Sequence, residues 1–92
     1  MYYVYLLISL KSGIFYIGQT ENLLQRFLDH NANRSEFTKH KGPWALVAFK
    51  QFPSRGAAMA EEYRLKKLKN KRRILLEFGI EPSNIKLTNK EA

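Results

Sequence analysis

The chain has no cysteine, only two histidines and no long apolar run, and each absence removes a class of function. Without cysteine there is no disulfide, no thiol nucleophile and no thiolate zinc site. Two histidines are too few for a histidine-rich metal site. A bound metal would therefore be held mostly by carboxylates, which favours a hard divalent cation such as Mg²⁺ or Mn²⁺.

The first ten residues, MYYVYLLISL, are apolar but do not form a convincing export signal. They lack the basic start and the small-residue cleavage site of a signal peptide. No segment approaches the roughly 20 apolar residues that span a bilayer. We therefore expect a cytoplasmic protein without membrane contact, and at 92 residues we expect a single domain.

Acidic residues are also scarce, since 8 Asp and Glu stand against 16 Lys and Arg, and the formal net charge is +8. This excess favours a polyanionic partner, because cationic side chains release the counterions condensed on nucleic acid. We therefore expect contact with nucleic acid. The alternative is a basic protein that is merely soluble, such as a ribosome-associated one.

Two tyrosine-rich runs near the start predict a β-hairpin. Residues 2–9 and 14–18 are rich in β-branched and aromatic side chains, and the sequence LKSG between them predicts a turn. With a loop over residues 9–12, Tyr5 would lie opposite Tyr16, and cross-strand partners share a face. The two phenols are then either core packing or a pair aimed at a phosphate.

The next segment predicts a helix over residues 21–31, with Thr20 as its N-cap. Arg26 and His30 are four residues apart, so they are neighbours on the helix surface, beside the apolar stripe and at the edge of the core. The stripe consists of Leu23, Leu24, Phe27 and Leu28.

The remaining chain predicts one more strand and two more helices. The fold class is therefore α+β, a three-stranded antiparallel sheet flanked by helices in the order β-β-α-β-α-α, with its core in residues 1–78. The predicted elements are a loop over 31–43, a strand over 44–52, a helix over 55–69 capped by Ser54, a helical segment to 78 after an interruption at Asn70, and a tail over 79–92.

Two adjacent carboxylates, Glu61 and Glu62, fall near the apolar stripe of the second predicted helix. A carboxylate beside a core is costly unless it is paired or bound to a cation. Lys66 follows Glu62 by four residues, so an ordinary helical ion pair is the simplest interpretation. Periodicity does not choose between the two glutamates.

The densest basic run begins at Lys66 and ends at Arg73. It is a solvated helix face or a contact surface for phosphates, and phosphate contacts do not read bases. Against the net charge of +8 we expect nucleic-acid contacts here. The residues that we assign to them are Lys66, Lys69, Arg72 and Arg73.

An ordered set of motifs is more specific than any single residue. The triplets YVY at 3–5 and YIG at 16–18 resemble those of the GIY-YIG nuclease superfamily, with Tyr3 in place of the first glycine. The chain looks closest to its small single-domain bacterial members, the UPF0213 type, and is similar to the nuclease domain of excinuclease C. The further matching elements are GQT at 18–20, Arg26 with His30, FTKHKGPW at 37–44 and AMAEEYRLK at 58–66.

This resemblance implies metal-dependent hydrolysis of DNA phosphodiester bonds, in repair or on branched or nicked DNA. By the family pattern, Tyr16 orients or deprotonates the attacking water and Tyr5 hydrogen-bonds near the same phosphate. Arg26 stabilises charge on the phosphoryl oxygens, and His30 supports proton transfer. Glu62 holds one divalent cation, Mg²⁺ or Mn²⁺.

The resemblance also selects Glu62 over Glu61, through the spacing from Ala58. Two other functions remain open. One is a nucleic-acid-binding module of the same fold with little or no catalysis. The other is an interaction domain of a larger repair complex, served by apolar side chains in RILLEFGI, residues 73–80, with a protein partner that the sequence does not identify.

Overall fold

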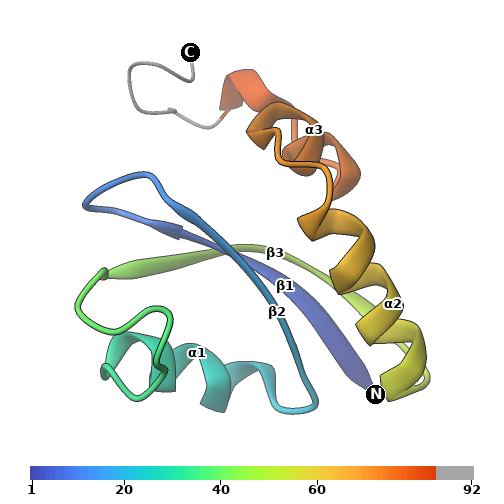
Figure 1. Ribbon diagram of the computed structural model, residues 1–92, viewed down its shortest axis with the longest axis horizontal. Helices are drawn as coiled ribbons and strands as arrows, with labels where there is room; N and C mark the ends of the chain where they lie inside the picture. Colours follow the sequence, from blue (N-terminus) through green and yellow to red (C-terminus); the bar gives the residue numbers. More distant parts are fainter. Residues whose placement is uncertain (85–92) are drawn as a thin grey trace.

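The structure is a computed structural model that describes residues 1–84 (Figure 1). The predicted element order β-β-α-β-α-α and the three-stranded antiparallel sheet are confirmed. Most of the predicted tail over 79–92 lies outside the described residues. The elements are β1 (Tyr2–Ser9), β2 (Phe15–Thr20), α1 (Leu23–Asn31), β3 (Trp44–Phe52), α2 (Arg55–Lys66), α3 (Lys71–Glu77) and a short 3₁₀ turn (Pro82–Asn84).

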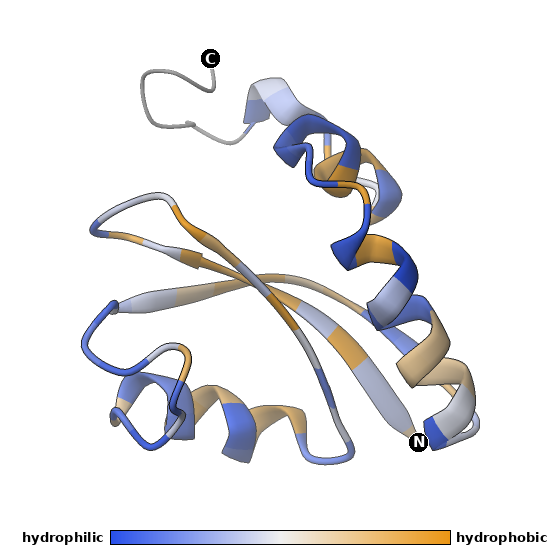
Figure 2. Ribbon diagram, viewed as in Figure 1, coloured by the Kyte–Doolittle hydropathy of each residue, from blue (hydrophilic) through white to orange (hydrophobic). Residues whose placement is uncertain are grey.

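The sheet has the strand order β2-β1-β3, so β1 is central and β2 forms one edge. Both faces of the sheet are covered. Figure 1 shows α1 on one face, and α2 followed by α3 on the other. A central strand buried on both faces needs apolar side chains on both, which explains the continuous apolar run at 2–9 in place of strict alternation. Figure 2 shows orange, apolar bands along β1 with paler stretches between them.

Two apolar clusters fill the space on the two faces. On the α1 face, Tyr5, Leu7 and Trp44 are buried, and partly buried side chains from β2, β3 and α1 pack against them. On the other face, a larger cluster joins the sheet to α2 and α3. Its buried members are Val4, Leu6, Ile17, Ala58, Leu65, Ile74 and Leu75.

The hairpin register differs from the prediction by two residues. Leu7 pairs with Tyr16, and Tyr5 pairs with Gly18. The predicted pairing of Tyr5 with Tyr16 is therefore wrong, because β2 starts later than expected and continues through Gly-Gln-Thr to residue 20. A shift of two residues keeps every side chain on its face. The two phenol rings consequently still share a face, with their centroids 6.2 Å apart.

Helix boundaries follow local side-chain hydrogen bonds. Asn22, not Thr20, caps α1, since its side chain accepts from the backbone N–H of Gln25. Ser54 caps α2 as predicted. The predicted extension of α2 to residue 69 is wrong, because Lys69 takes a left-handed conformation with φ of 50° and Asn70 then caps α3.

Two predicted apolar surfaces are only partly correct. In α1, Leu23 and Phe27 pack against the core, whereas Leu24 and Leu28 are 68% and 48% exposed. The helix is short and only one side meets the sheet, so the predicted stripe of four is too wide. In the segment 73–80, Ile74 and Leu75 are core residues. Phe78 and Ile80 are partly buried against the same core, whereas Leu76 is 55% exposed, so the apolar surface that this segment offers to a partner is smaller than the interaction-domain hypothesis assumed.

None of the helices within residues 1–84 is long and apolar enough to cross a membrane.

Gly18 tests the register directly, because a Cβ at this position would lie 2.5 Å from the Tyr5 hydroxyl and 2.7 Å from its ring carbon Cζ. We expect Gly18→Ala to destabilise the fold by about 1–3 kcal/mol, since Tyr5 is buried and cannot yield freely. Urea unfolding measures the change.

The matched control is Gly56→Ala in α2, where an added Cβ meets nothing within 4 Å. We expect its stability to be unchanged or higher by up to about 1 kcal/mol, because alanine is the better helix former. Equal stabilities for the two variants would contradict the Tyr5–Gly18 pairing.

Candidate active site

Four of the predicted site residues meet on the α1 face of the sheet. Tyr5 comes from β1 and Tyr16 from β2, whereas Arg26 and His30 lie one turn apart on α1. The His30 ring centroid is 4.9 Å from that of Tyr16 and 5.7 Å from that of Tyr5. The two strands and the helix thus bring together side chains that are up to 25 residues apart in the sequence.

His30 is fully buried and hydrogen-bonded through both ring nitrogens. Its Nε2 lies 2.8 Å from the Tyr5 hydroxyl, and its Nδ1 lies 2.7 Å from the Thr38 hydroxyl. Each hydroxyl can donate or accept, so either tautomer of the neutral ring satisfies both contacts. The result is a continuous chain from Tyr5 through His30 to Thr38.

Burial and the nearby guanidinium of Arg26 lower the pKa of His30 to about 4. The imidazole is therefore uncharged at neutral pH. On the same face, burial and then the neighbouring Tyr16 raise the pKa of Tyr5. Both partners of this hydrogen bond are neutral at pH 7, which suits a proton acceptor next to a phenol.

Arg26 lies beside the two phenols and is anchored at the far side of the cluster. Burial opposes its charge, but Tyr5 and Tyr16 outweigh that effect and raise the pKa of the guanidinium. One of its terminal nitrogens lies 3.5 Å from the buried Ser35 hydroxyl, at the limit of a hydrogen bond. A fixed, permanently charged group therefore faces the phenols.

Sequence reasoning missed the roles of Ser35 and Thr38, both in the connection between α1 and β3. The Thr38 carbonyl also accepts from the Trp44 indole N–H at 3.2 Å, which holds this loop against the sheet. Thr38 is part of the FTKHKGPW motif, so the motif itself was the available signal. Ser35 had no comparable signal, because a serine in a polar loop is unremarkable in sequence.

Glu62 lies on α2, which covers the other face of the sheet, at the β2 edge. The structure therefore does not place it inside the tyrosine cluster. Lys66 connects the two: its Nζ lies 2.6 Å from a Glu62 oxygen and 6.0 Å from the centre of the Tyr16 ring. The Glu62 charge also contributes, as the smallest of several causes, to the raised pKa of Tyr5. The carboxylate is thus adjacent to the cluster around the sheet edge.

The neighbouring Glu61 has a different environment. Its carboxylate forms ion pairs with Arg64 and with Lys50 on β3. These contacts lower the pKa of Glu61 to about 2, and the hydrogen bond from Arg64 is the largest cause. Arg64 also reaches Glu77 on α3. Glu61 therefore belongs to a network that ties α2 to β3 and α3, which leaves Glu62 as the carboxylate next to β2.

A pocket of about 250 Å³ adjoins Glu62 between β2 and α2. Residues 1–84 contain no group of three or more His, Cys, Asp or Glu side chains that could hold a metal. A single carboxylate beside one amide and one phenol oxygen suits Mg²⁺ or Mn²⁺, which complete their coordination with several waters and substrate phosphates. The residues fit such an ion. The pocket is lined by Gln19, Met59, Glu62, Tyr63 and Lys66.

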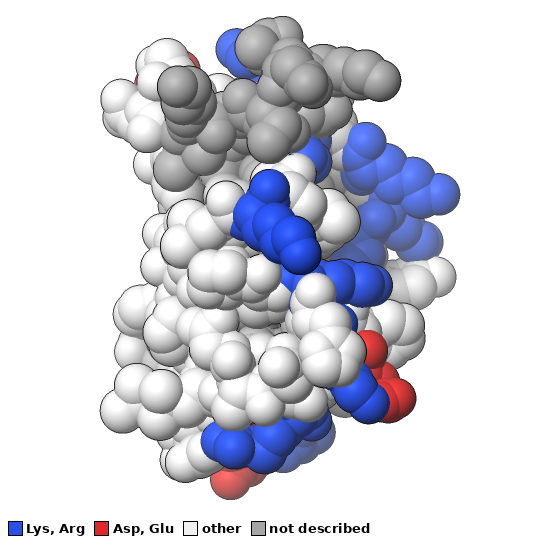
Figure 3. Space-filling view, turned by 90° about the vertical axis from the view of Figure 1, so that its left-hand side faces the viewer, with Lys and Arg blue, Asp and Glu red and all other residues white. Residues whose placement is uncertain are grey.

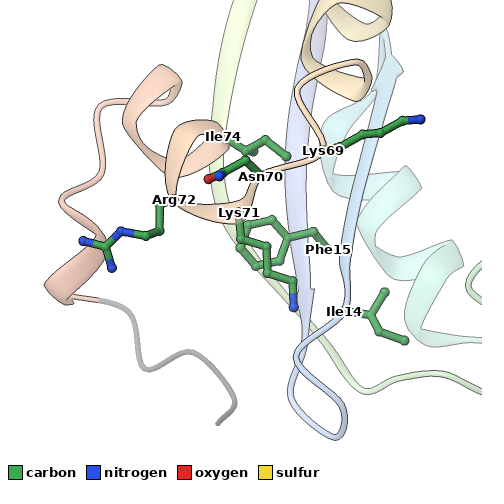
Figure 4. A pocket seen from close by; sticks show the side chains of 7 residues that line it. All are labelled: Ile14, Phe15, Lys69, Asn70, Lys71, Arg72 and Ile74. Atoms are coloured by element: carbon green, nitrogen blue, oxygen red, sulfur yellow. The ribbon is translucent and has the colours of Figure 1, made fainter. Parts of the chain in front are cut away.

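The predicted nucleic-acid-binding residues occupy two places. Lys66 belongs to the Glu62 pocket, whereas Lys69 and Arg72 line a separate cavity of about 510 Å³ between the hairpin and α3 (Figure 4). There Lys69 and Arg72 extend to opposite sides, and Lys71 donates to the Gly13 carbonyl at 2.9 Å. The lining holds no carboxylate or histidine, so this larger cavity has cationic surface but no acid–base group.

Basic side chains extend well beyond this cavity. On the face in Figure 3, Lys and Arg account for most of the charged surface, with few acidic side chains among them. Arg73 is exposed in α3. This distribution is suited to backbone phosphates and carries no base-reading geometry.

Comparison with known proteins identifies close relatives over the same residues. A family model described as the GIY-YIG catalytic domain matches residues 1–74. A UPF0213 protein of Clostridium perfringens is 36% identical over 92 residues, covering 99% of this chain and 95% of that protein. A UPF0213 protein of Halalkalibacterium halodurans is 36% identical over 73 residues, covering 78% and 77%.

The second of these relatives also has a solved structure. The solution NMR structure of the UPF0213 protein from Bacillus halodurans has a TM-score of 0.51 and 31% identity, covering 99% of this chain and 92% of that chain. The range matched by the family model, residues 1–74, contains Tyr5, Tyr16, Arg26, His30 and Glu62.

The buried imidazole predicts a specific pH dependence of stability. An unfolded histidine binds a proton below about pH 6.5, whereas folded His30 stays neutral down to about pH 4, so stability falls as the pH drops through this window. The shift corresponds to roughly 3 kcal/mol of unfolding free energy between pH 7 and pH 4.

We expect His30→Gln to be less stable at pH 7, because it loses the fitted imidazole, but to have a flatter profile across this window. Chemical unfolding at a series of pH values measures both curves, and subtracting them removes the shared titration of carboxylates. Parallel curves for the two proteins would contradict a neutral, buried His30.

Proposed function

Because the chain belongs to the GIY-YIG catalytic domain family, we propose that it is a divalent-metal-dependent endonuclease that hydrolyses phosphodiester bonds in DNA. The observation that carries this proposal is the convergence of two phenols, a guanidinium and a neutral imidazole on one face of the sheet. A carboxylate lies next to them, in the pocket at the β2 edge. These groups are Tyr5, Tyr16, Arg26, His30 and Glu62.

In this proposal Arg26 binds the scissile phosphate. Its planar guanidinium can donate two parallel hydrogen bonds to phosphoryl oxygens. Its pKa is raised and it is held against Ser35 and the phenols, so it does not have to reorganise as negative charge develops. Lysine would not offer the same fork.

Tyr16 and Tyr5 have different tasks because their burial differs. Tyr16 is partly exposed and flanked by Arg26 and Lys66, so it can contact the attacking water and orient it. Tyr5 is only 2% exposed and hydrogen-bonded to His30. Its phenol stays protonated at neutral pH and can donate its single proton to Nε2 of His30 while its oxygen accepts a proton from the phosphate side. In this way His30, anchored by Thr38, supports proton transfer.

Glu62 would hold the divalent ion. When bound, such an ion lowers the pKa of water and neutralises charge on the phosphate. The Lys66 ammonium forms an ion pair with the Glu62 carboxylate. For the metal to bind, Lys66 would have to move away from it, toward Tyr16 or the phosphate backbone. We propose DNA repair, or processing of branched or nicked DNA, as the setting, with residues 1–78 as the nuclease core.

One observation favours a second function, a DNA-binding module with little catalysis. The Glu62–Lys66 pair is an ordinary i,i+4 helical ion pair, and it satisfies the carboxylate without a metal. The basic surface at Lys69 and Arg72 would serve this function equally well. Comparing cleavage with binding separates the two functions.

Cleavage is tested by nicking of supercoiled plasmid with Mg²⁺ or Mn²⁺. We expect nicking by the native protein, a loss of about 100-fold or more in Arg26→Ala, because it removes charge stabilisation, and a similar loss in Glu62→Gln. Glu36→Gln, in an exposed loop position, is the matched control and should retain activity. Gel shifts should show that all variants still bind DNA.

If the native protein shifts DNA without nicking it, the binding module becomes the better description. If it does not shift DNA even at low salt, both proposals are wrong.

The cationic surface predicts the salt dependence of DNA binding. Replacing both Lys69 and Arg72 with Gln should reduce the slope of log Kd against log salt concentration by about two, since each phosphate contact contributes about 0.9. The control replaces Arg34 and Lys39, which face Asp29 and Glu36, and removes the same charge. Equal slopes in the two double variants would mean that DNA does not contact the α3 surface.

A further inference from the structure

The pocket beside Glu62 contains a polar atom that the protein itself does not satisfy. Within residues 1–84, the buried side-chain oxygen or nitrogen without a hydrogen-bond partner is Oε1 of Gln19. Gln19 lies on β2 and lines the same pocket of about 250 Å³ as Glu62 and Lys66. A buried acceptor without a partner is unfavourable, and such atoms in folded proteins commonly mark the place of a ligand, ion or water.

The position of Gln19 follows from strand alternation. Residues 16 and 18 of β2 lie on the α1 face of the sheet, whereas Ile17 faces the apolar core under α2. Because side chains alternate along a strand, Gln19 lies on the same face as Ile17. Apolar neighbours are available there, and an aliphatic side chain would pack without cost. An amide at this place is therefore unexplained by the core.

Apart from Gln19, the side chains of the pocket that carry an oxygen are Glu62 and the exposed Tyr63. The partner of the Glu62 carboxylate is the Lys66 ammonium at 2.6 Å. Carboxylate and amide oxygens are both ligands for hard divalent cations, either directly or through the ordered waters that Mg²⁺ and Mn²⁺ retain. The ammonium on Glu62 already shows that a cation is stable at this position.

We propose that Gln19 is a positioning residue for the divalent cation held by Glu62. Its amide oxygen accepts a hydrogen bond from a water bound to the cation or binds the cation directly, and Lys66 competes with the cation for the Glu62 carboxylate. This inference rests on the proposed metal role of Glu62 and extends it. It assigns opposite effects to two residues of one pocket. Loss of Gln19 weakens metal binding, and loss of the Lys66 charge strengthens it.

Titration of the DNA-free protein with Mn²⁺, followed through the electron paramagnetic resonance signal of free Mn²⁺, measures the affinity without any cleavage. We expect about 10-fold weaker binding in Gln19→Leu, the usual scale for a residue that supports a metal ligand. Gln19→Glu should bind at least as tightly as the native protein. Lys66→Met should bind about 5- to 10-fold more tightly, because a like charge next to the ion is removed.

Two controls separate this role from a structural one. Lys67→Met removes the same charge from the C-cap of the same helix. The Lys67 ammonium lies over the Tyr63 ring and not on a carboxylate, so we expect a clearly smaller effect than in Lys66→Met. In the metal-free state, Gln19→Leu should be at least as stable as the native protein, since it removes an unsatisfied buried acceptor.

Unchanged Mn²⁺ affinity in Gln19→Leu would overturn this inference while leaving the nuclease proposal to the nicking assay. Weaker binding in Lys66→Met than in the native protein would overturn the competition. Equal affinity in the native protein and Glu62→Gln, or no saturable binding by the native protein, would overturn the inference together with the metal role of Glu62.

Discussion

The hydrogen bond between the Tyr5 hydroxyl and buried His30 is the contact on which the candidate site depends. It joins the central strand to α1, and it exists only because three conditions hold together. Gly18 leaves room above β2 for the Tyr5 phenol. Thr38 occupies the second ring nitrogen of His30, and burial keeps the imidazole neutral. The site is therefore part of the core, and its chemistry and its stability cannot be varied independently.

The β2 edge determines how the parts of the site can cooperate. Phenols, guanidinium and imidazole lie on the α1 face, whereas Glu62 reaches the same edge from α2 on the opposite face. An edge strand has no further strand beside it, so in the proposed nuclease groups from both faces would meet there around one phosphate. Lys66 already spans this edge from Glu62 to Tyr16. The same arrangement places Gln19 next to the Glu62 carboxylate, although its neighbour along β2, Gly18, lies on the α1 face.

Much of the fold could be predicted because its elements depend on local patterns. The third strand, the Ser54 cap and the element order follow from apolar runs and cap residues and are confirmed. The errors occur where two local signals compete. Thr20 and Asn22 are both good caps, and the backbone of the turn decides between them. The hairpin register was wrong because loop length is not encoded in the apolar pattern, yet an even shift preserved the shared face of the two tyrosines.

The sequence by itself determined the basic charge, the order of elements and the motif set that identifies the family, because these are properties of composition, period and spacing. Only the tertiary structure decided which polar side chains are buried and what they contact. Ser35 and Thr38 became site neighbours through a loop that packs against α1. Glu61 differs from Glu62 because it forms ion pairs with Lys50 and with Arg64, and Arg64 in turn pairs with Glu77. Burial and long-range pairing depend on how chain segments pack in three dimensions, and no local pattern records them.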